Sequence, residues 1–256
     1  MADITTSRAR SLSLISLNAA LYAFVGYLTY LGIFAPVFFV VRFWPAVVVP
    51  GVFSCLVGPF VGGCGAAIGI FISDMMIHGD PILSLTVGVT SNFLGFYTVG
   101  YLAERLKNGS SSLKALNILV GISALVATIV FYALTLDMQG IPTSIINLLP
   151  GVVIASVIAL PFAYGFLKGD VELMRIFISS SLGLALGSAI IGFGIWGYSQ
   201  LFRLPPSVMG GALGLPLVAI PFLALWTFVT EIPFLIILIP PIYRALNAIT
   251  KGERRW

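Results

Sequence analysis

The strongest constraint on the fold is a stretch of 31 residues without a charged side chain, from Phe43 to Ser73. A glycine-proline pair at positions 58 and 59 breaks this stretch near its middle. One crossing of a ~30 Å hydrocarbon layer needs roughly 20 residues, so the stretch is too long for a single transmembrane helix. It predicts a hairpin of two helices, about 45–56 and 60–77, with both ends at one membrane face. Arg42 would then lie near the acidic end of the second helix.

Composition indicates a membrane protein. Hydrophobic residues make up 59% of the 256 residues and charged residues only 9%, whereas soluble domains carry roughly 25% charged residues. The expected fold class is therefore all-α and polytopic, with the lipid bilayer around it. The net charge of +4 does not indicate nucleic-acid binding, because the basic residues lie in short loops. The sequence contains no motif for ATP hydrolysis, zinc-dependent hydrolysis or esterase chemistry, so neither an enzyme nor a cofactor is predicted.

The apolar runs predict about eight transmembrane helices, and the charges then set their orientation. With the N-terminus inside, 11 of the 13 basic residues lie on the cytoplasmic side, as the positive-inside rule requires. Arg42 and Arg203 are the two that lie outside. We therefore predict a multi-pass protein of the cell membrane with both termini cytoplasmic. The expected crossings are 14–34, 45–56, 60–77, 82–103, 115–136, 144–167, 176–196 and 210–239, followed by a basic amphipathic tail.

A group of ionisable residues is expected at the outer end of the hairpin. Asp74 and His78 are four residues apart, so a helix places them on one face, and Asp80 follows Gly79. Two carboxylates and an imidazole suit a divalent cation, or a cationic or hydroxylated ligand. The alternative is a solvated helix end without a ligand. No second group of ligating residues accompanies them, so no metal site is predicted.

Further polar residues extend this candidate binding site. Arg42 either pairs with Asp74 or an anionic ligand group, or anchors the interface beside Trp44. Asn92 is an amide inside an apolar run, which bridges helices or contacts a substrate. The turn after the fifth crossing contributes Asp137. The expected substrate-binding residues are Arg42, Trp44, Asp74, His78, Asp80, Asn92 and Asp137.

Two further features of the apolar runs have more than one interpretation. Gly58, Gly62 and Ala66 are spaced by four, and small residues at this spacing let helices approach closely in lipid. Ordinary packing within the bundle explains them equally well. Glu231 is the deepest acid of the last run and is expected near its inner end. It either reaches the cytoplasmic interface or is neutral and hydrogen-bonded inside the bundle.

The hairpin sequence has a pattern typical of one transporter family. Residues 41–79 read VRFWPAVVVPGVFSCLVGPFVGGCGAAIGIFISDMMIHG. This resembles the substrate-binding S components of energy-coupling factor (ECF) transporters, which typically show an arginine opening the second helix and an LxGPxxGxxxGxxxD-like stretch through the third. Their six helices have both termini inside, a plan that residues 1–168 fit. Residues 169–256 add two helices and a tail that the family core lacks. The chain also lacks a Met-His start, which disfavours the cobalt/nickel branch.

The resemblance implies a function and a set of partners. Ala19 and Ala23 match the family's AxxxA motif, and by analogy they pack against a transmembrane coupling subunit joined to cytoplasmic ATPases. The chain would capture a small, vitamin-like solute from outside for ATP-driven uptake energised by these partners. One alternative is a non-catalytic scaffold or accessory subunit of a larger membrane complex, which the two extra helices favour. Another is an intramembrane enzyme using Asp74 and His78, although no nucleophile is visible.

Overall fold

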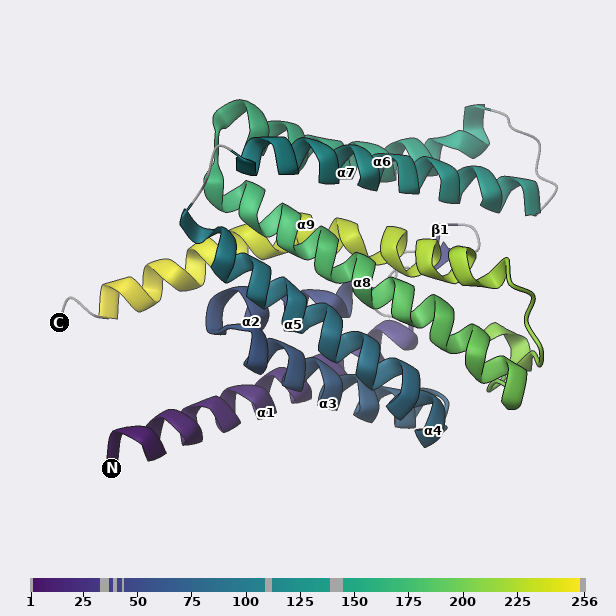
Figure 1. Ribbon diagram of the computed structural model, residues 1–256, viewed down its shortest axis with the longest axis horizontal. Helices are drawn as coiled ribbons and strands as arrows, with labels where there is room; N and C mark the ends of the chain where they lie inside the picture. Colours follow the sequence, from purple (N-terminus) through teal and green to yellow (C-terminus); the bar gives the residue numbers. More distant parts are fainter. Residues whose placement is uncertain are drawn as a thin grey trace.

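The fold is a bundle of helices, seen in a computed structural model that describes residues 2–32, 37–38, 41–42, 44–108, 112–138 and 145–253 (Figure 1). In chain order its elements are α1 (Ala2–Tyr30), β1 (Val37–Phe38), β2 (Val41–Arg42), the 3₁₀-helix η1 (Pro45–Val47), α2 (Val48–Val57), α3 (Pro59–Ile77), α4 (Pro81–Leu83), the π-helix η2 (Ser84–Gly88), α5 (Val89–Arg105), the 3₁₀-helix η3 (Leu106–Asn108), α6 (Ser112–Met138), α7 (Ile145–Lys168), α8 (Val171–Leu201), the 3₁₀-helix η4 (Met209–Gly211) and α9 (Ala219–Glu253).

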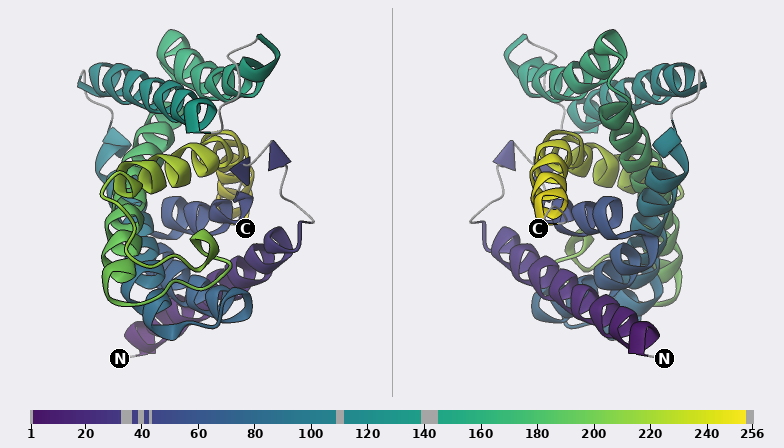
Figure 2. Two further views of the ribbon diagram at one scale, coloured as in Figure 1. Left: turned by 90° about the vertical axis from the view of Figure 1, so that its right-hand side faces the viewer. Right: turned by 90° about the vertical axis from the view of Figure 1, so that its left-hand side faces the viewer.

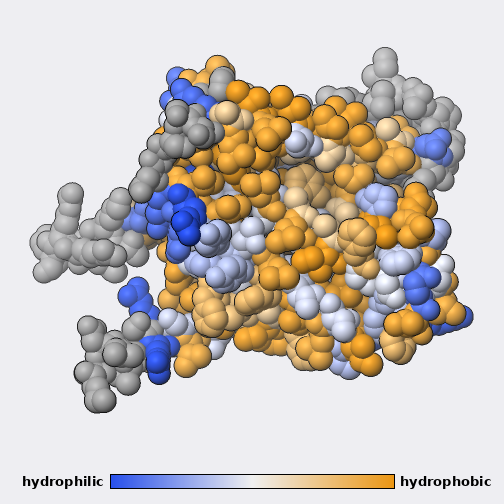
Figure 3. Space-filling view, viewed as in Figure 1, coloured by the Kyte–Doolittle hydropathy of each residue, from blue (hydrophilic) through white to orange (hydrophobic). Residues whose placement is uncertain are grey.

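Helix lengths and compositions indicate a multi-pass membrane protein. Six helices in the described part of the chain are long and apolar enough to cross a bilayer, namely α1, α3, α4–α5, α6, α8 and α9. The other two expected crossings are also helical, but their apolar segments, Pro45–Val57 and Ile154–Gly165, are shorter. Hydrophobic side chains cover the middle of the visible face, and hydrophilic residues gather towards its two ends (Figure 3).

The helices pack in a continuous series. Helix α1 lies along α3, α3 against α5, α5 against α8, and α8 against α9, while α2 contacts α1, α3, α5 and α9. Figure 2 shows α2 inside the ring that these helices form. The α6–α7 hairpin leans on α8 and α9. Because α8 and α9 pack on α2 and α5, the expected six-helix segment 1–168 and the segment 169–256 share one hydrophobic core.

The expected hairpin at the centre of the sequence is confirmed. One arm is η1 with α2, the other is α3, and Gly58 forms the turn between them with a φ of +120°. Only glycine adopts this region readily, because it has no Cβ. At 1.5 Å per residue, the arm from Pro45 to Val57 is about 20 Å long, which is less than the ~30 Å hydrocarbon core.

The last helix differs from the sequence expectation. We expected a crossing over 210–239 and a separate tail after Pro240 and Pro241. The chain between Phe202 and Val218 is instead a linker with only the short η4, and α9 then runs unbroken to Glu253. Glycines at positive φ and three prolines in the linker prevent an earlier helix start. Glu231 therefore lies 12 residues into α9, about 18 Å along its axis, rather than near its inner end.

Close contact between α1 and α3 depends on glycines of α3. A Cβ at Gly69 would lie 2.8 Å from the backbone oxygen of Ala19 and 2.9 Å from Cβ of Tyr22. Nearby, the Asn18 amide donates hydrogen bonds to the backbone oxygens of Val61 at 3.1 Å and Gly62 at 3.3 Å. The small residues of the hairpin thus serve packing inside the chain, as in the simpler of the two interpretations above.

Replacing Gly69 with alanine should loosen this packing. The added methyl group meets backbone atoms of α1 that cannot rotate away, and overpacking of this kind costs about 1–3 kcal/mol. We expect Gly69→Ala to lower the thermal melting midpoint of the purified chain in detergent. Gly197→Ala is the matched control, because a Cβ at this position of α8 meets nothing within 4 Å. Equal midpoints for the two variants would contradict this account of the α1–α3 contact.

Candidate functional site

A cavity of about 330 Å³ lies between α1, α3, α5, α8 and α9. At one end it is lined by the tip of α3 and by Ser207 and Val208 of the 202–218 linker. From there it extends into the bundle as far as Val99 and Leu184. Its walls are mainly apolar, and its polar side chains come from different helices. The polar and aromatic residues that matter below are Tyr22, Trp44, Asp74, His78, Asn92, Ser188, Thr227 and Glu231.

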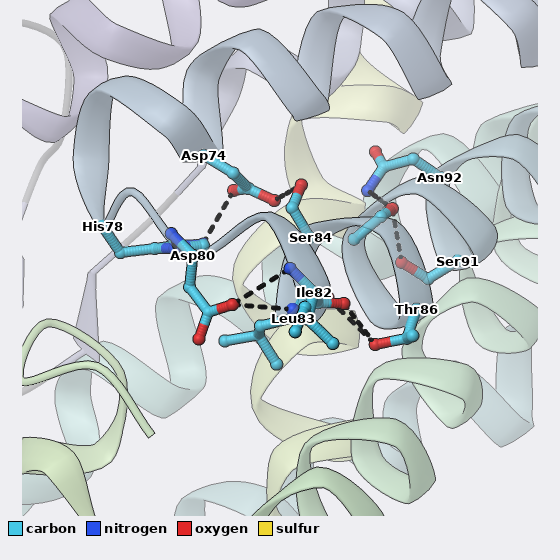
Figure 4. A network of polar contacts seen from close by, with 10 residues as sticks. Asp74, His78, Asp80, Ile82, Leu83, Ser84, Thr86, Ser91 and Asn92 are labelled. Carbon is cyan, nitrogen blue, oxygen red and sulfur yellow. Dashed lines mark hydrogen bonds and ion pairs between the residues drawn. The ribbon is translucent and has the colours of Figure 1, made fainter. Parts of the chain in front are cut away.

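Asp74 and His78 form a connected pair at the end of α3. Their side chains are 16% and 6% exposed, and the distance from His78 Nε2 to Asp74 Oδ1 is 3.6 Å. The backbone N–H of Asp80 donates a hydrogen bond to His78 Nδ1 at 3.1 Å. In the neutral imidazole the proton is therefore on Nε2, directed at the carboxylate. Ser84 Oγ donates to the other carboxylate oxygen, Asp74 Oδ2, at 2.7 Å (Figure 4).

The wide turn between α4 and α5 makes room for this carboxylate. Residues Ser84–Gly88 form a π-helix, a local widening that is frequent at functional sites. A Cβ at Gly88 would lie 2.5 Å from Asp74 Oδ2. The absence of a side chain at Gly88 therefore lets η2 lie directly against Asp74.

Asn92 serves both roles that the sequence left open. Its Nδ2 donates to the backbone oxygen of Gly88 at 2.9 Å, and its Oδ1 accepts from the hydroxyl of Tyr22 at 2.9 Å. The amide thus bridges α1 and α5, and it also lines the cavity. Tyr22, which the sequence did not single out, joins the site through this bond.

Asp80 has a structural role beside the cavity. Its Oδ1 accepts from the backbone N–H groups of Ile82 and Leu83, both at 3.0 Å, and so caps α4. The hydroxyl of Tyr198 on α8 donates to its Oδ2 at 2.6 Å. Partial burial raises the pKa of Asp80, but the hydrogen bonds from Tyr198, Leu83 and Ile82 outweigh burial and hold the pKa below its ordinary value. Asp80 is thus committed to the backbone and to Tyr198, and it does not line the cavity.

The remaining predicted binding residues fall in three places. Trp44 lines the cavity. The backbone of Arg42 pairs with Val37 in the β1–β2 ladder, but its side chain lies outside the described atoms, so its pairing with Asp74 stays a prediction. Asp137 is exposed at the end of α6 and does not contribute to the cavity lining.

The two alanines predicted to contact a coupling subunit face the interior of the chain. Ala19 is 3% exposed and Ala23 is 6% exposed, and the backbone oxygen of Ala19 packs on Gly69 of α3. The surface predicted for docking is therefore covered by the chain's own third helix. The apolar side chains that α1 exposes are Leu17, Leu21 and Phe24.

Sequence reasoning did not select two further residues of the cavity lining, Glu231 and Ser188. Glu231 was noted only as a lone acid in an apolar run, and its expected depth was wrong because α9 begins later than expected. Ser188 is 2% exposed, and its Oγ has no hydrogen-bond partner in the described part of the structure. A single serine in a glycine-rich helix carries no signal in the sequence that marks it as part of a site.

A second, more apolar space of about 440 Å³ lies between α6, α8 and α9. Its lining is formed by side chains such as Leu119, Ala185 and Phe228. Ser188 lines both this space and the interior cavity.

The chemistry of the site does not indicate a metal centre. No group of three or more His, Cys, Asp or Glu side chains that could hold a metal ion occurs among the described residues. Asp80, the third member of the expected cluster, caps α4 with one oxygen and accepts from Tyr198 with the other, so it does not converge with Asp74 and His78 on one point. Comparison with family models, curated proteins and solved structures finds no match to this chain.

Removing the Asp80 carboxylate should destabilise the α4 end of the site. Loss of an N-cap side chain costs about 0.5–2 kcal/mol, so we expect Asp80→Ala to melt at a lower temperature at neutral pH. The pKa of Asp80 is lower in the folded chain than in the unfolded chain. Its stabilisation is therefore complete above the unfolded pKa and is lost as the pH falls through the folded pKa.

Melting curves of wild type and Asp80→Ala between neutral and acidic pH measure this difference. The gap between the two midpoints should shrink as the solution becomes acidic. Asp137→Ala removes an exposed carboxylate at the same end of the bundle and serves as the control. A gap that is absent at neutral pH, or that widens in acid, would contradict the capping role.

Proposed function

We propose that this chain is a membrane-embedded substrate-binding subunit that captures a small, vitamin-like solute from outside the cell. The observation that supports this most directly is the interior cavity, which runs from one end of the bundle to the level of Asn92 and Glu231. Its volume of about 330 Å³ lies within the range of about 300–1,000 Å³ common for small-molecule sites. Apolar walls with a few converging polar groups are also typical of such sites.

The charge distribution supports an outward-facing cavity. The start of α1 and the end of α9 lie at the same end of the bundle (Figure 1). That end also carries the basic residues Arg105, Lys107, Lys114 and Lys168, which flank the ends of α5, α6 and α7. Under the positive-inside rule this end is cytoplasmic. The cavity then opens towards the opposite, outer face, next to Asp74 and His78.

The sequence supports transport energised by other subunits. It contains no motif for binding or hydrolysing ATP, and the hairpin pattern resembles that of ECF S components. We therefore propose a transmembrane coupling subunit and cytoplasmic ATPases as partners. Because Ala19 and Ala23 are buried against α3, a coupling subunit would use a different surface of this chain.

The proposal is tested by the molecule that the chain retains. Native mass spectrometry of protein purified in a mild detergent should detect one small solute per chain. Asp74 lines the cavity, and Asp74→Asn keeps its shape while removing its charge. If Asp74 accepts a hydrogen bond from the solute, the variant should bind the released solute about ten- to 150-fold more weakly.

Glu104→Gln is the matched control, because Glu104 is an exposed carboxylate at the opposite end of α5. It should bind the solute with wild-type affinity. Recovery of a stable multisubunit assembly without any retained solute would instead favour the scaffold or accessory subunit. Wild-type affinity in Asp74→Asn would remove this residue from the binding site.

A further inference from the structure

Glu231 places a carboxylate without a described partner deep in the bundle. It lies about 18 Å from the start of α9 and lines the cavity. No hydrogen bond or ion pair joins it to any side chain that the structure describes. A carboxylate at membrane depth is costly unless a proton or a cation neutralises it. Glu231 therefore favours either its own protonation or a positively charged occupant of the cavity.

Polar groups on the neighbouring helices lie at a similar depth. Ser188 is 13 residues from the end of α8 at Leu201, and Asn92 is 11 residues from the start of α4 at Pro81. These separations correspond to about 20 Å and 17 Å along the helices. The Ser188 hydroxyl is buried and unpartnered in the described structure and lines the same cavity. Such a hydroxyl in a low-dielectric interior is expected to find a partner when one is present.

The charges around the cavity are of one sign. Asp74 lies near its outer end and Glu231 in its interior, and the described residues of the lining include no lysine or arginine. The titratable groups that accompany them on α1 and α3 are Tyr22, Tyr30 and His78. Two carboxylates without a cationic counterpart repel an anionic solute and attract a cationic one. The low dielectric of the bundle strengthens this preference relative to water.

We infer that the solute is a small organic cation whose protonated amine is held in the interior of the cavity by Glu231 and Ser188. An ammonium group offers three hydrogen-bond donors, which suit the carboxylate and the free hydroxyl. The apolar body of the solute lies against aromatic side chains of the lining, such as Tyr22 and Phe96. This inference rests on the proposed function, because it specifies the solute class of the same site.

Three probes of nearly equal size and shape test the charge preference. They are phenethylammonium, 2-phenylethanol and 3-phenylpropionate, which are cationic, neutral and anionic at neutral pH. Each is titrated into the purified full-length chain in detergent, and the thermal midpoint is measured. A ligand that binds only the folded state raises the midpoint in proportion to its affinity. We expect a saturable rise with phenethylammonium and at most a tenth of that affinity with the other two.

The variants separate the carboxylate from the rest of the cavity. Glu231→Gln should weaken phenethylammonium binding about ten- to 150-fold and leave 2-phenylethanol binding unchanged. Ser188→Ala, a smaller change, should weaken only the amine and covers the case in which Glu231→Gln does not fold. Glu104→Gln, whose carboxylate lies outside the cavity, should bind all three probes as the wild type does.

Several results would overturn the inference. These are equal or tighter binding of the alcohol or the propionate, wild-type amine affinity in both Glu231→Gln and Ser188→Ala, or no rise with any probe. The molecule retained on purification judges the two proposals separately. A neutral or anionic molecule would overturn the cation class and leave solute capture standing. Absence of any retained molecule would count against solute capture itself.

Discussion

The contact between α1 and α3 determines the geometry of the whole binding region. In lipid, apolar surface alone gives helices little reason to associate, so close packing and hydrogen bonds between helices must hold them. Asn18 supplies such a bond to the backbone of α3, and Gly69 lets the two backbones approach. Tyr22 is one turn beyond Asn18 on the same face of α1. Fixing Asn18 therefore fixes the tyrosine that reaches across the cavity to Asn92.

The helices were largely predictable from the sequence, because apolar runs of spanning length leave a chain in lipid few other structures. The hairpin turn was predictable for the same reason, since Gly58 and Pro59 interrupt an uncharged run. The end of the last crossing was not. A local rule places a helix boundary before Pro240, yet α9 continues through it. Packing against α2, α7 and α8 supports a helix there that the local sequence disfavours.

The candidate site was predictable only in part. Asp74 and His78 share a helix face because of their spacing, and Asn92 stands out as an amide in an apolar run. The role of Asp80 follows from the following proline, because aspartate before a first-turn proline is a common helix start; that signal was present but not used. The direction of Ala19 and Ala23 depends on which face of α1 meets α3. Spacing along one helix carries no information about that choice.

Ser188 gives the bundle an unusual boundary. The interior cavity and the apolar fissure beside α6 both include this residue in their linings, so at this level the partition between them is one side chain thick. Any change in the size of residue 188 acts on two compartments at once. A larger side chain narrows both, and a glycine removes the one residue that the two described linings have in common. The separation of the protein's interior from its fissure thus depends on a single hydroxymethyl group.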